Sequence, residues 1–213
     1  YIASLPWQHP ELAVAELERA CSNGAVGAMV LANIRGMALS DPFLAPIWQA
    51  IDDRALPVLV HPTDPPGHKE MNLKNVGGSM PFLLDTTLAV TRLVFDGFFD
   101  RYTSLKFIAS HGGAAIPLAH GRMDLFWRQG APSNRTIDTP PSEHLKRIYL
   151  DAVVYQMNAL EMGIDMVGPE RVMFGTDFPH PTDIPGLLER ARALPREQSD
   201  AILGRNAMRV FAL

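Results

Sequence analysis

Short apolar runs alternate along the chain with longer segments in which apolar residues recur every three or four positions. Five runs, at residues 25–33, 57–61, 105–110, 147–154 and 171–176, are almost continuously apolar, and residues 1–5 form a shorter candidate. Such runs are typical of parallel strands that are covered on both faces. The alternation therefore predicts β/α units with five or six parallel strands.

The segments between these runs predict amphipathic helices. Val14, Leu17 and Cys21 share one face of a segment that starts after Pro10 and ends near Gly24, so Cys21 is expected to be a packed core thiol. Two further stripes predict buried helix faces: Leu44, Ile47, Trp48 and Ile51, and then Leu84, Leu88, Thr91, Phe95 and Phe98 or Phe99. Repeated strand and helix units leave two solutions open, a doubly wound sheet or a (β/α)8 barrel.

The composition narrows the classes of partner. The 213 residues are 47% hydrophobic and 20% charged, with a formal net charge of -4 and no basic run, so nucleic acid is not an expected partner. No stretch has the length and apolar character of a membrane span. The single cysteine excludes an internal disulfide framework and favours a reducing, cytoplasmic location. No predicted strand is followed by a Gly-rich phosphate-binding motif, so nucleotide binding has no support.

Three polar side chains, His61, His111 and Asp177, stand directly at the carboxyl ends of three predicted strands. These ends converge on one mouth in a barrel, so we expect the three side chains to meet. Imidazole and carboxylate groups suit a divalent ion such as zinc, which lowers the pKa of a bound water to about 7. The alternative for each histidine is a buried, hydrogen-bonded side chain without a metal, but three coincident strand ends favour a metal site.

Five segments carry a resemblance to a known family. They are LVHPTDPPG (59–67), DTTLAVTRLVFDGFFDRY (85–102), LKFIASHGGAAIPLAHGRMD (105–124), VMFGTDFPHP (172–181) and AILGRNAMRVF (201–211). Together they resemble the amidohydrolase-related family, and most closely its branch of aminocarboxymuconate semialdehyde decarboxylase-like enzymes. The resemblance covers nearly the whole chain and implies a distorted (β/α)8 barrel of the TIM-barrel type with one divalent metal ion, zinc first and manganese second.

The resemblance also implies roles for four residues. His61 would be a metal ligand, His111 would lie beside the metal-bound water and transfer protons, and Asp177 would both ligate the metal and take a proton. Arg122, eleven residues after His111, would bind the substrate carboxylate in the site of a neighbouring subunit, which predicts a homodimer. The alternative for Arg122 is a solvated charge on a helix surface.

One feature of the family is missing from this sequence. The family supplies two more metal ligands from an H-x-H motif on its first strand, and none of the seven histidines forms such a pair. Residues 1–5 would then be the third strand, so we expect residues 1–213 to be a single barrel domain that lacks its first two strands. A barrel without two of its eight strands has unpaired edges and an open core, and should be neither stable nor active alone.

The predicted function is a metal-dependent decarboxylase, a carbon–carbon lyase, whose partner is a small carboxylated aromatic or muconate-type acid. A first alternative is a hydrolase or hydratase of the same family with one metal ion, since the run 25–33 ends without the lysine of binuclear members. A second alternative is an inactive barrel remnant. His9, His68 and His180 are weaker candidates, expected to be surface or loop residues, and Trp7 either lines the pocket or packs.

Overall fold

Each of the six apolar runs contains a strand in the computed structural model, which describes residues 1–71, 78–180 and 182–213. The strands are β1 (Ile2–Ser4), β2 (Gly27–Leu31), β3 (Pro57–His61), β4 (Lys106–Ala109), β5 (Tyr149–Asp151) and β6 (Val172–Met173). They form one parallel sheet in the order β1-β2-β3-β4-β5-β6. Sheet order that follows chain order without reversal is the arrangement of a β/α barrel, whereas a doubly wound sheet reverses at a switch point. The fold is therefore a partial (β/α)8 barrel.

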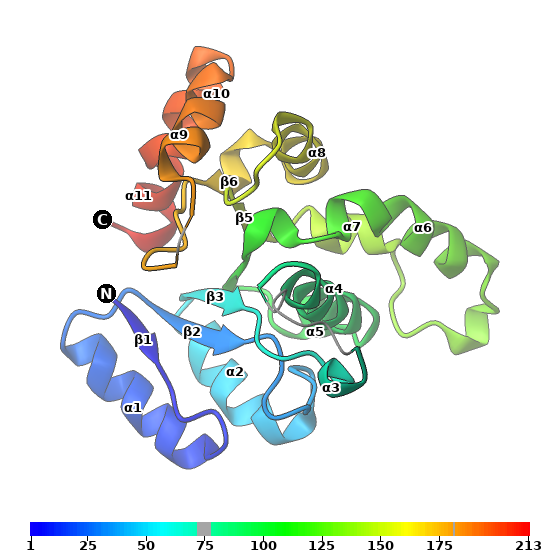
Figure 1. The fold of residues 1–213 in the computed structure, drawn as a ribbon. Coiled ribbons are helices and arrows are strands. Elements are labelled where there is room, and N and C mark those ends of the chain that lie inside the picture. Colours follow the sequence, from blue (N-terminus) through cyan, green and yellow to red (C-terminus); the bar gives the residue numbers. More distant parts are fainter. Residues whose placement is uncertain (72–77, 181) are drawn as a thin grey trace.

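Helices follow the strands along the chain (Figure 1). They are α1 (Pro10–Ser22), α2 (Ala45–Asp52), α3 (His68–Met71), α4 (Met80–Phe95), α5 (Phe98–Arg101), α6 (Ile116–Gln129), α7 (Pro141–Leu145), α8 (Met157–Val167), α9 (Ile184–Ala193), α10 (Arg196–Asp200) and α11 (Asn206–Phe211). Figure 1 shows α1 and α2 along β1 to β3, and the two chain ends on the same side of the view. Prolines stand in the first turns of α1 and α2.

The main core lies between the helices and one face of the sheet. Trp48 of α2 is 1% exposed, and it packs against Trp7 and Phe98 with ring centroids 4.8 and 5.0 Å away. The stripe predicted on α2 is buried throughout. Cys21 of α1 is half-buried and packs against this core.

The opposite face of β1 and β2 is only partly covered. Ala3 and Ala28 are buried among the helices, whereas Ile2 and Leu31 on the other face are 38% and 39% exposed. The expectation that the apolar strands are covered on both faces is therefore wrong for this part of the sheet. Side chains on this second face border a cavity instead.

The buried face of α4 differs from the predicted stripe. Leu84 is 42% exposed, whereas Asp85, Ala89 and Leu93 face the core. Asp85 is accommodated on this buried face because its carboxylate accepts hydrogen bonds from Asn33 Nδ2 at 2.9 Å and from the backbone N–H of Thr63 at 2.9 Å. The predicted stripe is therefore not the buried face, which also carries Val90 and Val94. Phe98 and Phe99 are buried as expected, but on the separate helix α5.

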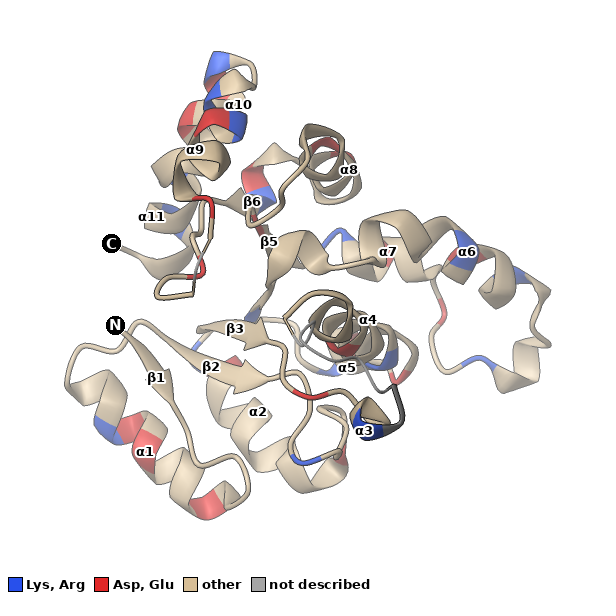
Figure 2. Cartoon of the chain, in the orientation of Figure 1, with Lys and Arg blue, Asp and Glu red and all other residues tan. Residues whose placement is uncertain are grey.

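Charges of both signs are interspersed along the helices. Figure 2 shows acidic and basic residues together on α1 and on the helices near the C-terminus. Within residues 1–71, 78–180 and 182–213, no helix combines the length and hydropathy needed to cross a bilayer.

Candidate metal centre

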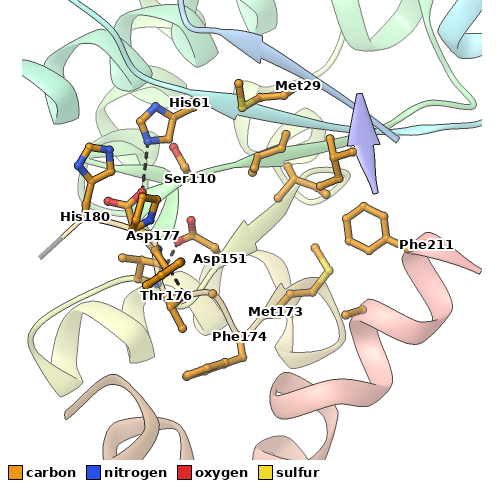
Figure 3. Close-up of a pocket in the computed structure, with 18 residues that line it drawn as sticks. Met29, His61, Ser110, Asp151, Met173, Phe174, Thr176, Asp177, His180 and Phe211 are labelled. Atoms are coloured by element: carbon orange, nitrogen blue, oxygen red, sulfur yellow. Dashed lines mark hydrogen bonds and ion pairs between the residues drawn. The ribbon is translucent and has the colours of Figure 1, made fainter. Parts of the chain in front are cut away.

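His61, His111 and Asp177 come together beyond the carboxyl edge of the sheet. His61 is the last residue of β3, His111 follows β4 by two positions, and Asp177 follows β6 by four. One nitrogen or oxygen from each side chain lies within 4.8 Å of the other two. Nε2 of His61 is 3.4 Å from Asp177 Oδ1, and Nε2 of His111 is 3.5 Å from Asp177 Oδ2. Figure 3 shows His61 and Asp177 pointing toward each other.

The hydrogen bond of His61 Nδ1 indicates what can lie between the side chains of His61 and Asp177. Its Nδ1 is 2.8 Å from the carbonyl oxygen of Pro62. A carbonyl oxygen only accepts hydrogen bonds, so Nδ1 is the donor of this bond and Nε2 is left to face Asp177 Oδ1. A carboxylate oxygen is an acceptor as well, so Nε2 and Oδ1 attract each other only with a proton or a cation between them. An imidazole whose second nitrogen donates to a backbone carbonyl is typical of metal ligands, so the donor set fits a divalent cation.

Two of the three residues have left-handed backbone conformations. The φ angle is +55° at His111 and +57° at Asp177. Residues other than glycine rarely adopt this region, and such positions are concentrated at functional sites. Gly112 and Gly113, with φ of +64° and +75°, continue the turn after His111. The polar cluster is therefore built on turns that the surrounding structure must hold in place.

Asp151, at the end of β5, is a part of the site that the sequence analysis missed. Its carboxylate accepts hydrogen bonds from the backbone N–H groups of His111 and Gly112, both at 2.9 Å, and of Val153 at 3.0 Å. Burial raises the pKa of the Asp151 carboxyl above its ordinary value, against the lowering effects of the His111 charge and of the three N–H groups. It was overlooked because the apolar run 147–154 continues past it, so it did not mark a strand end in the sequence.

A cavity of about 550 Å³ adjoins the cluster. Figure 3 shows His61, Ser110, Asp151, Asp177 and His180 toward one end and Met173 and Phe211 toward the other. Asp177 thus contacts both imidazoles and also lines the cavity, whereas His111 contacts Asp177 but does not line the cavity.

Of the other predicted residues, Arg122 and His68 lie outside the cavity, whereas His180 lines it. Arg122 is on the exposed surface of α6, where its guanidinium lies 4.9 Å from the centre of the Phe126 ring, and it does not line the cavity. His180 lines the cavity, whereas His68 lies 3.7 Å from Asp64. The last residue of the predicted motif 172–181 lies outside the described residues.

The other two candidates pack or face solvent. Trp7 is buried and donates a hydrogen bond from Nε1 to the backbone oxygen of Met29, so it packs. His9 is exposed at the start of α1 and makes no side-chain cap.

The fold and the cluster define a class of protein: a β/α barrel with imidazole and carboxylate groups gathered at the carboxyl ends of its strands. The chain belongs to the amidohydrolase family, whose model (Amidohydrolase) matches residues 2–213. It is 28% identical over 218 residues to a 2-amino-3-carboxymuconate-6-semialdehyde decarboxylase of Dictyostelium discoideum, a match that covers 100% of this chain and 60% of the relative. The chain thus spans about 60% of the length of this curated relative.

Two solved structures are similar to the fold. The 5-carboxyvanillate decarboxylase of Sphingomonas paucimobilis superposes with a TM-score of 0.91 at 25% identity, covering 100% of this chain and 66% of that one. A dihydroxybenzoic acid decarboxylase from Polaromonas sp. JS666, solved with bound manganese and the inhibitor 2-nitroresorcinol, has a TM-score of 0.87 at 26% identity. This match covers 100% of the present chain and 68% of the Polaromonas chain.

Proposed function

We propose that this chain carries the active site of a metal-dependent decarboxylase that acts on a small carboxylated aromatic or muconate-type acid. The observation that carries the proposal is the convergence of His61, His111 and Asp177 at the carboxyl edge of an amidohydrolase-family sheet. Similarity to a carboxymuconate semialdehyde decarboxylase and to two aromatic acid decarboxylases supports the substrate class. Phe178, which is 78% exposed and lines the cavity beside Asp177, adds an aromatic surface suited to a planar acid.

His61 and Asp177 would hold the metal ion. A nitrogen and oxygen donor set accepts either zinc or manganese, and the manganese in the similar dihydroxybenzoic acid decarboxylase favours manganese for this chain. When bound, such an ion would polarise oxygen atoms of the acid. The His61 ring is held for this role by its Nδ1–H bond to Pro62.

His111 and Asp177 would supply the proton. In decarboxylation, a proton adds to the carbon that bears the carboxylate, the carbon–carbon bond breaks, and carbon dioxide leaves. The proton would be held between His111 Nε2 and Asp177 Oδ2, which lie 3.5 Å apart, and Asp177 would present it to the cavity. His111 lies deeper, with its side chain 13% exposed, and would restore the proton after each turnover.

Arg122 would contribute to the site of a second copy of the chain. It lies on α6, whose surface also exposes the apolar residues Leu118, Leu125 and Phe126, at 77%, 42% and 54%. A group of exposed apolar side chains on one helix is typical of an interaction surface. This supports a homodimer in which the guanidinium binds the carboxylate of the partner's substrate. We also propose that residues 1–213 form one domain, because one sheet and one main core run through the residues that the structure describes.

The test is a direct assay of carbon dioxide release. Full-length protein loaded with manganese or zinc is incubated with 2,6-dihydroxybenzoate, 5-carboxyvanillate and 2-amino-3-carboxymuconate-6-semialdehyde, and both released carbon dioxide and the decarboxylated product are measured. We expect at least one of these acids to lose its carboxylate, and we expect chelation to abolish the reaction. Addition of water without release of carbon dioxide would instead indicate a hydratase or hydrolase. A protein that purifies without stoichiometric metal and is inactive on all three acids would indicate an inactive remnant.

A further inference from the structure

The turn that carries His111 is held from outside by a neighbouring strand. His111, Gly112 and Gly113 all have positive φ, and Ala114 has a φ of +57° as well. The residue at position 111 does not itself stabilise this conformation, because a residue with a Cβ atom is strained at positive φ. Something beyond the turn must therefore fix its conformation.

The carboxylate of Asp151 makes the contacts that can do so. Its Oδ2 accepts the backbone N–H of His111 at 2.9 Å, and its Oδ1 accepts the backbone N–H of Gly112 at 2.9 Å. Successive N–H groups that point to one side of a left-handed turn form an anion-binding concavity. In this protein the anion is a side chain of the chain itself. The third bond, from Val153 N–H to Oδ1 at 3.0 Å, fixes the carboxylate to the end of β5.

Steric contacts keep the turn packed against β5 and the residues that follow it. A Cβ atom at Gly112 would lie 2.4 Å from Val154 Cγ1, and one at Gly113 would lie 2.8 Å from Leu150 Cδ2. The His111 side chain itself has weaker support, since Ser110 Oγ lies 3.4 Å from its Nδ1. The direction of the imidazole is therefore set mainly by its backbone.

We infer that Asp151 is a positioning residue for His111: its carboxylate binds the N–H groups of His111 and Gly112 and so directs the imidazole toward Asp177. The inference rests on the proposed function in one respect, namely that His111 transfers a proton. Asparagine cannot replace the carboxylate. It has a single acceptor oxygen, so its amide NH2 would face either the N–H of His111 or the two N–H groups that now bind Oδ1.

The chain offers a control for Asp151→Asn at the other end of β4, the strand that leads into the turn of His111. Oδ1 of Asp52 accepts the backbone N–H groups of Ser104 and Leu105, both at 2.8 Å, just before β4 begins. Asp52 thus binds two successive N–H groups, as Asp151 does, but at the opposite edge of the sheet. Asp52→Asn removes a carboxylate charge without touching the turn of His111, and its one amide oxygen can still accept both N–H groups.

The experiment is a double-mutant cycle in the full-length, metal-loaded protein. We expect Asp151→Asn to lower kcat roughly 10²-fold, the loss typical of an active-site group displaced by about 1 Å. Adding it to His111→Ala should cost no more than about threefold beyond His111→Ala alone, because the two changes remove one function. We expect Asp52→Asn to leave kcat unchanged. Two outcomes would overturn the inference. In one, the separate losses of kcat in Asp151→Asn and His111→Ala multiply in the double variant; in the other, Asp151→Asn has the kcat of the wild type.

A crystal structure of Asp151→Asn tests the same inference without activity. We expect the φ angle at His111 to leave the left-handed region and its Nε2 to move away from Asp177. An unchanged turn and an unchanged distance of Nε2 from Asp177 would overturn the inference even if no acid is decarboxylated by the wild type. If Asp151→Asn does not fold, Asp151→Glu replaces it, because glutamate keeps the charge but displaces the oxygens by one methylene. The same two quantities are then measured: the φ angle at His111 and the distance of its Nε2 from Asp177.

Discussion

Gly112 has no room for a side chain, and its replacement by alanine has a cost that can be worked out from the structure. The first contribution is conformational, because φ at Gly112 is +64° and a residue with a Cβ atom loses about 1–2 kcal/mol in the left-handed region. The second is steric. The new Cβ would lie 2.4 Å from Val154 Cγ1, and overpacking of this kind costs about 1–3 kcal/mol. We therefore expect Gly112→Ala to lower the free energy of unfolding by about 2–5 kcal/mol.

Two other glycines separate these contributions. Gly24 has a φ of +88° but open space around its missing Cβ, so Gly24→Ala should cost only the conformational part, about 1–2 kcal/mol. Gly121 lies inside α6, also with open space, and Gly121→Ala should stabilise the protein by about 0.5–1 kcal/mol because alanine favours the helix.

The assay is urea unfolding of the full-length protein and its three variants, followed by circular dichroism at one fixed metal concentration because a bound ion shifts the apparent stability. Thermal midpoints provide a second measure, at about 2–4 °C per kcal/mol for a domain of this size. A Gly112→Ala variant within about 0.5 kcal/mol of Gly24→Ala would refute the steric argument, since measured differences of that size are within the range of unremarkable surface substitutions.

Four further predictions concern the site and the buried Asp85. His61→Ala and Asp177→Ala should each lose tightly bound metal, measured by elemental analysis, and stoichiometric metal in either variant would remove that residue from the ligands. His111→Ala should keep much of its metal while activity falls by about 10²- to 10⁴-fold, whereas complete metal loss would make His111 a ligand. Arg122→Ala should raise KM for the acid more than it changes metal content, and mixing it with Asp177→Ala should restore some activity through hybrid dimers; no rescue in exchanging dimers would argue against the cross-subunit role. Burial raises the pKa of Asp85, so the folded protein binds that proton more tightly than the unfolded chain. The ionised form costs stability at pH 7, and wild type should therefore gain stability relative to Asp85→Asn as the pH falls from 7 toward about 4, which urea titrations at several pH values would measure.

Much of the fold could be predicted because parallel strands appear in a sequence as short, almost continuously apolar runs. All six runs contain strands, and the polar residues that end three of them meet in space. The prediction that His61, His111 and Asp177 lie close together is confirmed, because parallel strands bring their carboxyl ends to one edge whatever the distance along the chain.

The parts that could not be predicted depend on polar groups that are buried. Asp151 lies inside an apolar run, and only the structure shows that β5 ends there and that the carboxylate binds the turn of His111. Asp85 lies on the otherwise largely apolar buried face of α4, and its partners, Asn33 and Thr63, come from loops far away in sequence. Helical periodicity describes how apolar residues are spaced and contains no information about such partners.

The order of the sheet has a consequence for how the chain folds. Because every strand pairs with the next one in sequence, each pairing closes a single β/α unit: Ile2 pairs with Gly27, and Pro57 with Lys106. No described pairing requires two distant halves of the chain to find each other first. Loop-closure entropy is therefore lost in steps of one β/α unit each. We expect the sheet to grow strand by strand along the chain, because on a synthesising ribosome β1 to β3 emerge, each beside its partner in sequence, before the residues of β6 exist.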